Sequence, residues 1–219
     1  MIREFDLNSV QVTDAYFVNA FDKVTEYLLS LEPDRLLAGF KAVSAGKDPL
    51  TEPNLNLYGG WEGGWRLLRG HTMGHYLTAL AQAYRQTQNR DQDLSERLAE
   101  KINYTVSQLK VFQDRSPNGY LFASPETHFD VVEGKSTGNQ WAPWYTMHKL
   151  ISGLVSVYKY TGNQEALQVA ARLGDWTYER SSQWDEDLKR RVLSVEYGGM
   201  NDGLYELYKF TNDPKHLAA

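Results

Sequence analysis

The sequence predicts an all-α protein, and three observations support that class. Apolar residues recur at intervals of three and four along almost the whole chain, which is the period of an amphipathic helix. No convincing run of alternating apolar and polar residues indicates a β-strand. A turn motif recurs three times between helical stretches. Together they predict about three helical hairpins arranged as in an α/α toroid, where inner helices surround a pocket and outer helices cover them.

Six apolar stripes define the predicted helices in order. The first follows Thr13-Asp14, a pair typical of the start of a helix. The stripes run over residues 17–31, 77–84, 94–109, 147–158, 166–177 and 200–210. Segments 58–76 and 113–148 lie between stripes and are predicted as long connections, which are usually functional inside a compact domain.

The helices end in a repeated signature. Residues 84–89 read YRQTQN, residues 158–163 read YKYTGN and residues 208–213 read YKFTND. Each time an aromatic residue closes a helix, and a Thr-x-Asn or Thr-x-Asp turn precedes the next one, as in a helical hairpin. The third copy stops at 214–219, where an outer helix would begin. We therefore expect residues 1–219 to be the N-terminal portion of a longer helical domain.

The composition is that of a globular protein with a moderate negative charge. The 219 residues are 42% hydrophobic with a net charge of −5, which predicts one folded domain and no nucleic-acid partner. No apolar run approaches the ~20 residues of a membrane span, and the first ten residues lack a secretory pattern. The simplest expectation is a cytoplasmic protein. Because the sequence has no cysteine, disulfides and thiolate metal sites within this chain are excluded.

Aromatic residues are frequent, with 14 Tyr, 8 Phe and 6 Trp. Such numbers of Trp and Tyr indicate either a Tyr-rich helical core or an amphipathic pocket. Four tryptophans, Trp61, Trp65, Trp141 and Trp144, fall in the two long connections. Each connection ends where a hairpin begins, so both are expected to open on the same face of the bundle.

His71 and His75 are four residues apart and so share one helix face. Two histidines at that spacing can bind zinc, as in the H-E-x-x-H motif, where a third ligand completes the site and the Glu acts as general base. Here no acid stands between them, and we expect no metal. Contact with a substrate hydroxyl is the favoured interpretation, with Gly70 and Gly74 leaving room for a ligand. A structural role inside the inner ring is the alternative.

His148 follows Trp144 and Tyr145 near the start of the fourth helix. Aromatic rings pack on the apolar faces of sugars, and imidazole nitrogens bond to hydroxyls. These three residues are therefore candidates for substrate binding. A buried core histidine is the alternative interpretation of His148.

Residues 196–203 read EYGGMNDG at the start of the sixth helix. Paired glycines would let the backbone approach a ligand closely, and Glu196, Tyr197 and Asn201 are further candidates for substrate binding. A glycosidase needs two carboxyl groups, or one and another nucleophile, beside the bond that it cuts. Nothing marks two acids in these motifs as such a pair, so the catalytic residues stay unassigned.

A family resemblance is carried by four ordered stretches: YGGWE at 58–62, LRGHTMGHYLTALAQAY at 68–84, WAPWYTMHKLISGL at 141–154 and VEYGGMNDGLYELY at 195–208. With them the chain resembles the β-L-arabinofuranosidases of glycoside hydrolase family 127 and its relative, family 146, over essentially its whole length. The resemblance implies the N-terminal half of a catalytic domain that is an (α/α)6 six-hairpin toroid. It also implies a carbohydrate substrate and retaining hydrolysis of terminal L-arabinofuranosides in plant-type glycans.

The same resemblance implies a zinc-bound cysteine thiolate as nucleophile and a glutamate as acid/base in the full-length enzyme. Neither the nucleophile nor the zinc site carries over to any position here, because this chain has no cysteine. No cofactor is therefore expected in this segment. Asn201-Asp202 stands where the family usually has Asn-Glu. We expect the segment to supply part of a sugar-binding pocket, with the remainder of the same catalytic domain as its partner and no membrane contact.

Two other classes of function stay open. Sugar epimerases of the same helical architecture use histidines as acid and base, and His71 or His75 together with His148 would serve. A non-catalytic, helical carbohydrate-binding module is the second alternative.

Overall fold

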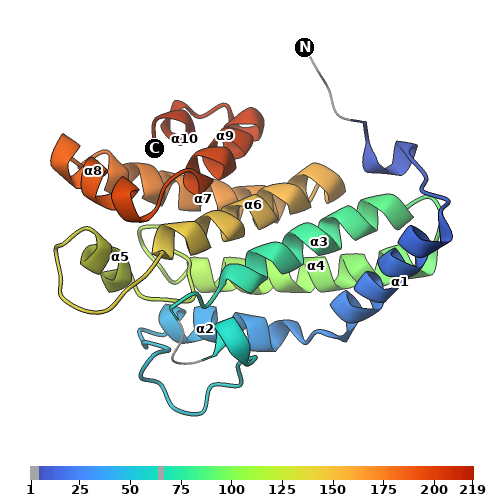
Figure 1. Cartoon of the computed structure of the whole chain (residues 1–219), viewed down its shortest axis with the longest axis horizontal. Coiled ribbons are helices and arrows are strands. Elements are labelled where there is room, and N and C mark those ends of the chain that lie inside the picture. Colours follow the sequence, from blue (N-terminus) through green and yellow to red (C-terminus); the bar gives the residue numbers. More distant parts are fainter. Residues whose placement is uncertain (1–4, 64–66) are drawn as a thin grey trace.

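The computed structural model describes residues 5–63 and 67–219 and is all-helical there, which confirms the predicted class (Figure 1). Two short 3-10 helices cover Leu7–Ser9 and Gly60–Glu62. The α-helices are α1 (Ala15–Ser30), α2 (Pro33–Ser44), α3 (His71–Thr87), α4 (Gln92–Gln113), α5 (Thr127–Val132), α6 (Pro143–Thr161), α7 (Gln164–Ser181), α8 (Glu186–Val195), α9 (Gly199–Thr211) and α10 (Pro214–Ala218). All six predicted stripes fall in helices.

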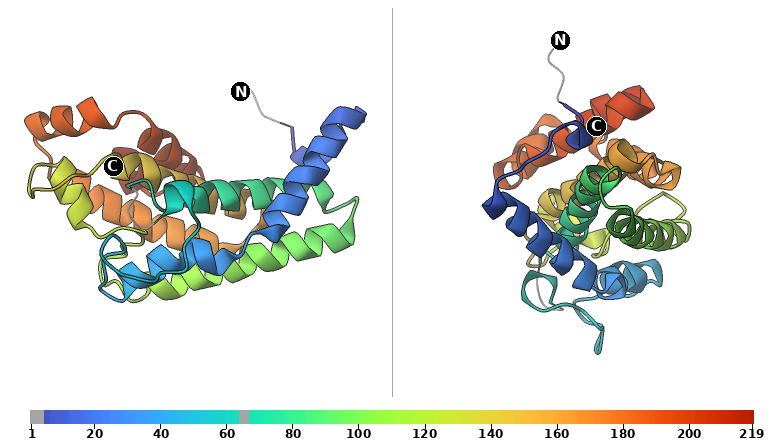
Figure 2. Two further views of the ribbon diagram at one scale, coloured as in Figure 1. Left: turned by 60° about the horizontal axis from the view of Figure 1, so that its bottom comes forward. Right: turned by 90° about the vertical axis from the view of Figure 1, so that its right-hand side faces the viewer.

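The helices form two rows of neighbours. In the inner row, α3 packs on α6 and α6 packs on α9; in the outer row, α4 packs on α7 and α7 packs on α10. Each inner helix is joined to the outer helix that follows it, so the chain contains the three predicted hairpins. The earlier helices extend both rows, because α1 contacts α3 and α2 contacts α4. Both figures show α3 and α4 running side by side for most of their length (Figures 1 and 2).

The repeated Thr-x-Asn/Asp turns work as hairpin connections. Thr161 and Thr211 each donate a side-chain hydrogen bond to a carbonyl four residues earlier. Asn163 and Asp213 then cap the next helix by accepting a backbone N–H bond, which satisfies an otherwise unpaired donor. In the first copy of the turn, α4 is capped two residues later than expected, by Asp91.

Helices α3 and α6 approach each other closely at two glycines. A Cβ atom on Gly74 would lie 2.0 Å from the Lys149 carbonyl oxygen of α6, and one on Gly153 would lie 2.6 Å from the Gly74 oxygen. From the sequence we expected the space at Gly70 and Gly74 to hold a ligand. That interpretation is wrong: Gly74 makes room for a helix, and Gly70 is the N-cap of α3 with φ of +98°.

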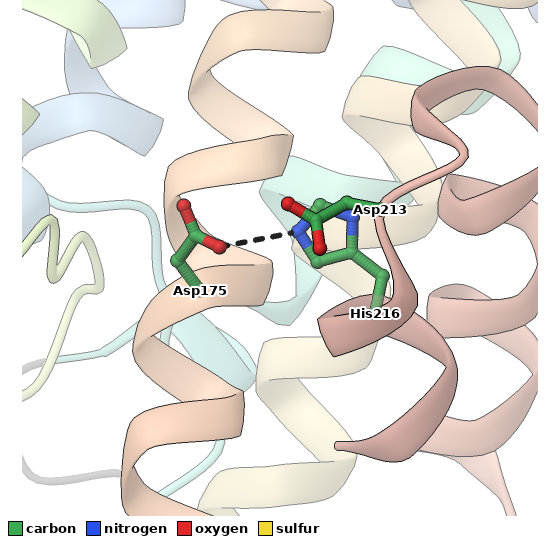
Figure 3. Close-up of side chains that lie close together, drawn as sticks. All are labelled: Asp175, Asp213 and His216. Carbon is green, nitrogen blue, oxygen red and sulfur yellow. Dashed lines mark ion pairs between the residues drawn. The ribbon is translucent and has the colours of Figure 1, made fainter.

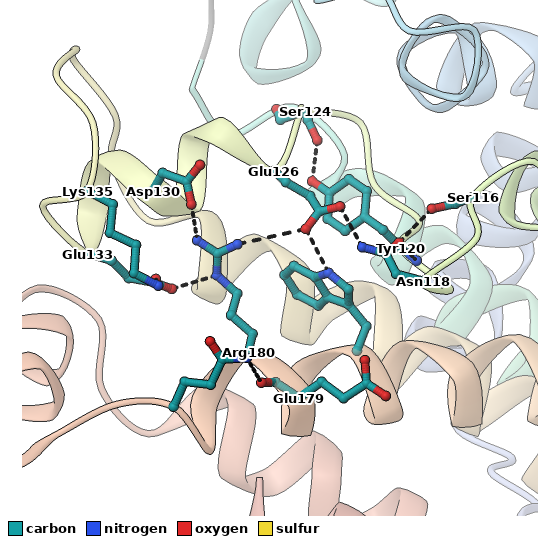
Figure 4. Close-up of polar contacts among 12 residues, drawn as sticks. Ser116, Asn118, Tyr120, Ser124, Glu126, Asp130, Glu133, Lys135, Glu179 and Arg180 are labelled. Carbon is teal, nitrogen blue, oxygen red and sulfur yellow. Dashed lines mark hydrogen bonds and ion pairs between the residues drawn. The ribbon is translucent and has the colours of Figure 1, made fainter.

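Segment 113–148 is not the open loop that we expected. Residues 120–123 are buried in the core, and α5 adds a further turn of helix. Arg180 of α7 ties this segment down through ion pairs at 2.6 Å to Glu133 and 2.5 Å to Asp130, with Glu126 at 3.8 Å (Figure 4). The segment is therefore packed against the helices, and Trp141 lies near its end.

The first predicted stripe is only partly covered. On α1, Leu28 is buried, whereas Phe17 is 60% exposed and Val24 is 52% exposed. This helix covers α3 with its C-terminal half and leaves much of its apolar face on the surface. None of the helices in residues 5–63 and 67–219 has the length and apolar character to cross a membrane.

The close α3–α6 crossing predicts the effect of adding a single methyl group. Gly74→Ala forces that methyl group into the Lys149 backbone. We therefore expect the free energy of unfolding to fall by about 3 kcal/mol and the Tm to fall by about 6–12 °C. Gly59→Ala is the matched control, because a Cβ atom there meets nothing within 4 Å. Thermal melts of both variants check this expectation. Equal Tm values would contradict the close packing.

Candidate functional site

The amino ends of the inner helices α3, α6 and α9 meet at one end of the bundle. Trp61, before α3, lies against His71 with ring centroids 5.1 Å apart. Glu196, before α9, accepts a 2.8 Å hydrogen bond from the backbone N–H of Tyr145 in α6. The described parts of segment 58–76 meet segments 141–148 and 196–203 here, because residues of all three line one cavity, as expected from their positions at the starts of hairpins.

A cavity of about 570 Å³ opens between these segments, a size typical of small-molecule sites. Five of the eight predicted site residues line it: Trp144, Tyr145, Glu196, Tyr197 and Asn201. His71, His75 and His148 lie beside it but do not belong to its lining.

The aromatic residues of the cavity divide into exposed and buried ones. Trp61 and Trp141 are 59% and 56% exposed, and each offers a ring face to a ligand. Trp144 also lines the cavity, but it is buried in an aromatic cluster, where its ring centroid lies 5.4 Å from that of Trp184. Its main contribution is therefore to the core. Trp65, which the sequence analysis grouped with these residues, lies outside the described residues.

Glu62 is a buried carboxylate that holds the amino end of α3. Its Oε2 accepts a 2.8 Å bond from Gly70 N–H, and its Oε1 accepts a 3.0 Å bond from Thr72 N–H and lies 3.2 Å from His71 Nδ1. Burial raises the pKa of Glu62, but the bonds from His71, Thr72 and Gly70 outweigh it and leave the pKa below its ordinary value. Glu62 is an ionised structural cap at neutral pH.

The two histidines of α3 have different surroundings. His71 is buried, and its Nδ1 is engaged by Glu62 and by the Leu68 carbonyl at 3.2 Å, so the structural interpretation fits this residue. His75 is exposed, with its ring 5.7 Å from that of His71. Partial desolvation of the ring and the nearby Lys149 and His71 all lower the pKa of His75. His75 is therefore a neutral hydrogen-bonding group at pH 7.

Glu196 is the second buried carboxylate, and it holds the amino end of α6. Its Oε2 accepts the bond from Tyr145 N–H, whereas its buried Oε1 has no hydrogen-bond partner among the described residues. Desolvation raises the pKa of Glu196 to about 7, against the lowering effect of the α6 amides. The carboxyl group thus stands near half-protonation at neutral pH, with one oxygen buried and without a hydrogen-bond partner among the described residues.

His148 lies in the second turn of α6, one turn later than expected, because α6 begins at Pro143. It is buried beneath Gly199, where a Cβ atom would lie 2.4 Å from His148 Nδ1. The expected approach of this glycine to a ligand is instead an approach to the imidazole. Burial and the Lys149 charge lower the pKa of His148 to about 4, although Tyr145 and Asp202 act in the opposite direction.

Helix α8 supplies cavity residues that the sequence analysis missed. Val192 and Leu193 line the cavity from α8, which was not predicted as a helix. The signal was present in the sequence: Asp185 caps the helix, and Leu188 and Val192 are four residues apart. Trp61 and Trp141 were noted in the connections but were not chosen as site residues.

A separate cluster contains Asp175, Asp213 and His216, whose ligand atoms lie within 4.8 Å of one another (Figure 3). His216 is buried, with Nδ1 at 2.8 Å from the Thr211 hydroxyl and Nε2 at 3.2 Å from the Ala171 carbonyl. Both nitrogens are therefore engaged, and Asp213 caps α10. This cluster docks α10 onto α7 and leaves no imidazole nitrogen for a metal.

The two rows of hairpins and the cavity at their amino ends define a protein of the α/α toroid class. A family model described as the β-L-arabinofuranosidase, GH127 catalytic domain matches residues 9–219. The chain belongs to this family, as its sequence motifs indicated. No curated protein matches the chain.

A solved structure supports the same fold. The chain is similar to Ara127N-Se, a GH127 β-L-arabinofuranosidase from Geobacillus stearothermophilus T6, with 16% sequence identity and a TM-score of 0.59. The match covers 95% of this chain and 31% of that one. The chain thus spans about a third of the length of that enzyme, and at this identity the likeness concerns the fold.

The raised pKa of Glu196 predicts how stability depends on pH. The neutral carboxyl is favoured in the folded state. Its contribution to the free energy of unfolding is therefore complete below the ordinary pKa of 4.5 and is lost as pH rises through about 7. Glu196→Gln stays neutral at every pH. We expect this variant to gain up to ~2–3 kcal/mol over the wild type between pH 5 and pH 8, measured by urea unfolding.

Glu62→Gln is the matched control and should show the opposite trend. The lowered pKa of Glu62 contributes stability above its ordinary value of 4.5, and this contribution is lost as pH falls. At pH 8 the variant should be about 1–3 kcal/mol less stable than the wild type, with a smaller difference at pH 4. If the stability of the two variants, relative to the wild type, changed with pH in the same direction, the opposite pKa shifts of Glu62 and Glu196 would be contradicted.

Proposed function

We propose that this protein is a glycoside hydrolase of the β-L-arabinofuranosidase type that acts on terminal L-arabinofuranosides. In this proposal the chain supplies one wall of the sugar-binding pocket. The observation that carries it is the 570 Å³ cavity at the amino ends of three inner helices, in a chain that belongs to the GH127 catalytic-domain family.

The lining of the cavity suits a small sugar. Trp61 and Trp141 offer exposed ring faces to apolar C–H groups. The side-chain amide of Asn201 offers bonds to hydroxyl groups, and the carboxyl of Glu196 adds a second polar group to the lining. The exposed ring of Tyr145 is also part of the lining and completes a mixed aromatic and polar surface.

The histidines fit hydroxyl binding better than proton transfer. An epimerase that uses two histidines needs one of them protonated at the working pH. The pKa of His148 is lowered to about 4 and that of His75 is also lowered, so both are neutral at pH 7. His75 is thus proposed as a hydroxyl contact, with buried His148 behind it and His71 as support for the helix end.

The groups that break the glycosidic bond are not assigned to this chain. The zinc-bound thiolate that the resemblance implies does not fit the residues present, because the sequence has no cysteine. Among the described residues the candidate metal cluster is the one at His216, whose nitrogens are already engaged. The remainder of the catalytic domain is the proposed source of the nucleophile and of the acid/base.

Binding without turnover is the expected behaviour of the 219-residue chain. Methyl β-L-arabinofuranoside should bind in calorimetry, and Trp141→Ala should weaken that binding about tenfold, because a ring face is lost. Tyr205→Ala is the matched control: this tyrosine of α9 is 51% exposed and lies outside the cavity lining. An aryl β-L-arabinofuranoside should not be hydrolysed, with or without added zinc.

Two results would contradict this proposal. If no L-arabinofuranoside binds, the cavity does not have the proposed role, and a carbohydrate-binding function for this chain would be lost with it. If the pure chain hydrolyses the aryl substrate, and a substitution within the chain abolishes that activity, then catalytic groups are present here and the division of roles is wrong.

A further inference from the structure

Helix α8 is only weakly attached to the rest of the bundle. Of its ten residues, all of which the structure describes, Val192 alone is buried. Helix α5 is shorter, yet His128, Phe129 and Val132 are buried in it. Figures 1 and 2 show α8 at the end of the bundle, on the side of α5, and in the described part of the chain it does not pack along another helix. An element with so little buried surface is easily displaced.

Most polar contacts of α8 are internal to the helix. Asp185 caps its first turn. Lys189 and Arg190 each form an ion pair with an acid three residues earlier in the same helix, at 2.9 Å and 2.5 Å. These contacts stabilise the helix itself but do not fix its position. Helix α8 can therefore move as one body.

One polar side chain of α8 reaches another element in the described part of the chain. The Nε of Arg191 donates a 3.1 Å hydrogen bond to the carbonyl of Val132, at the end of α5. The guanidinium also lies against Gly134, where a Cβ atom would come within 2.7 Å of Arg191 Cζ. Helix α5 is itself held by ion pairs to Arg180. Arg191 thus fastens a weakly attached helix to a fixed one.

The side of α8 that borders the cavity is apolar and only half covered. Leu193 and Val195 line the cavity, yet they are 51% and 49% exposed. Apolar side chains gain free energy when they are covered. The backbone is extended at Asp185 and at Glu196, on either side of the helix, and rotation at these two residues would turn the apolar side of α8 towards the cavity.

We propose that α8 is a lid on the cavity. Arg191 holds the open position, and α8 turns inward when a ligand occupies the cavity, so that Leu193 and Val195 cover the ligand. A ligand shifts such an equilibrium through its preference for the closed state. This inference takes its ligand, an L-arabinofuranoside, from the proposed function and adds a conformational step to binding.

Two substitutions on α8 should therefore change the affinity in opposite directions. Arg191→Ala removes a contact of the open state, so methyl β-L-arabinofuranoside should bind about threefold more tightly. Leu193→Ala removes a contact of the closed state, so the same sugar should bind about threefold more weakly. Arg190→Ala is the matched control and should leave the affinity unchanged, because Arg190 pairs within α8 and lies outside the cavity lining. Calorimetry measures all three affinities.

Spin labels follow the position of α8 directly. The sequence has no cysteine, so the paired substitutions Ser194→Cys on α8 and Glu165→Cys on α7, both at exposed positions, provide the only labelling sites. The distance between the two labels should change when Arg191→Ala is added and when the sugar is bound. Glu165→Cys with Glu179→Cys, both on α7, is the control pair, and its distance should stay constant.

The outcomes separate the lid from the proposed function. If the sugar binds but the Ser194–Glu165 label distance stays the same in the complex and in the Arg191→Ala variant, the lid is refuted while the proposed function stands. The lid is also refuted if Arg191→Ala and Leu193→Ala weaken binding equally. If no sugar binds, the proposed function fails. The label distance in the unliganded Arg191→Ala variant then decides the lid: a changed distance supports it for another ligand, and an unchanged one refutes it.

Discussion

The site depends on buried carboxylates that hold the amino ends of the inner helices. The first backbone N–H groups of a helix have no partner within the helix, and where inner helices converge these donors face the interior. Glu62 satisfies them at α3 and Glu196 at α6. Each acid comes from the segment before an inner helix, so the same bonds that complete a helix also fix a connecting segment over the cavity. Trp61 and Tyr197, the neighbours of these acids in sequence, are thereby placed in the cavity lining.

The two carboxylates differ because their partners differ. Glu62 has hydrogen-bond partners on both oxygens, with His71 among them, and these lower its pKa despite burial. Glu196 has fewer partners, one bare oxygen and a pKa raised to about 7. A fully bonded carboxylate has little capacity left for a ligand, whereas a buried carboxyl with one bare oxygen gains by meeting a hydroxyl. The same residue type is thus a support in one place and the proposed binding group in the other.

Much of the fold could be predicted from the sequence, since long amphipathic stripes and the Thr-x-Asn/Asp turns are local signals. The helices that the sequence did not predict are those whose stability comes from tertiary contacts. Helix α5 is six residues long and is held by Arg180, and the helix-forming pattern of α8 is short. The role of two glycines was predicted wrongly for a related reason. A small residue indicates that another group lies close but not which group it is. Gly74 lies against the Lys149 backbone and Gly199 against the His148 ring. Motif positions indicated segments that meet at one end of the bundle, whereas the burial of Trp144 and His148 depends on packing that no local pattern encodes.

We propose that the converging helix ends and their carboxylate caps form a sugar-binding site. A crystal structure of the protein with bound methyl β-L-arabinofuranoside tests it most directly. We expect a sugar ring packed against Trp141 or Trp61, with a hydroxyl about 3 Å from the side chain of Glu196 or Asn201 and the Glu196–Tyr145 bond intact. A sugar bound elsewhere, or a sugar with no hydroxyl near either side chain, would rule out this role for the cavity.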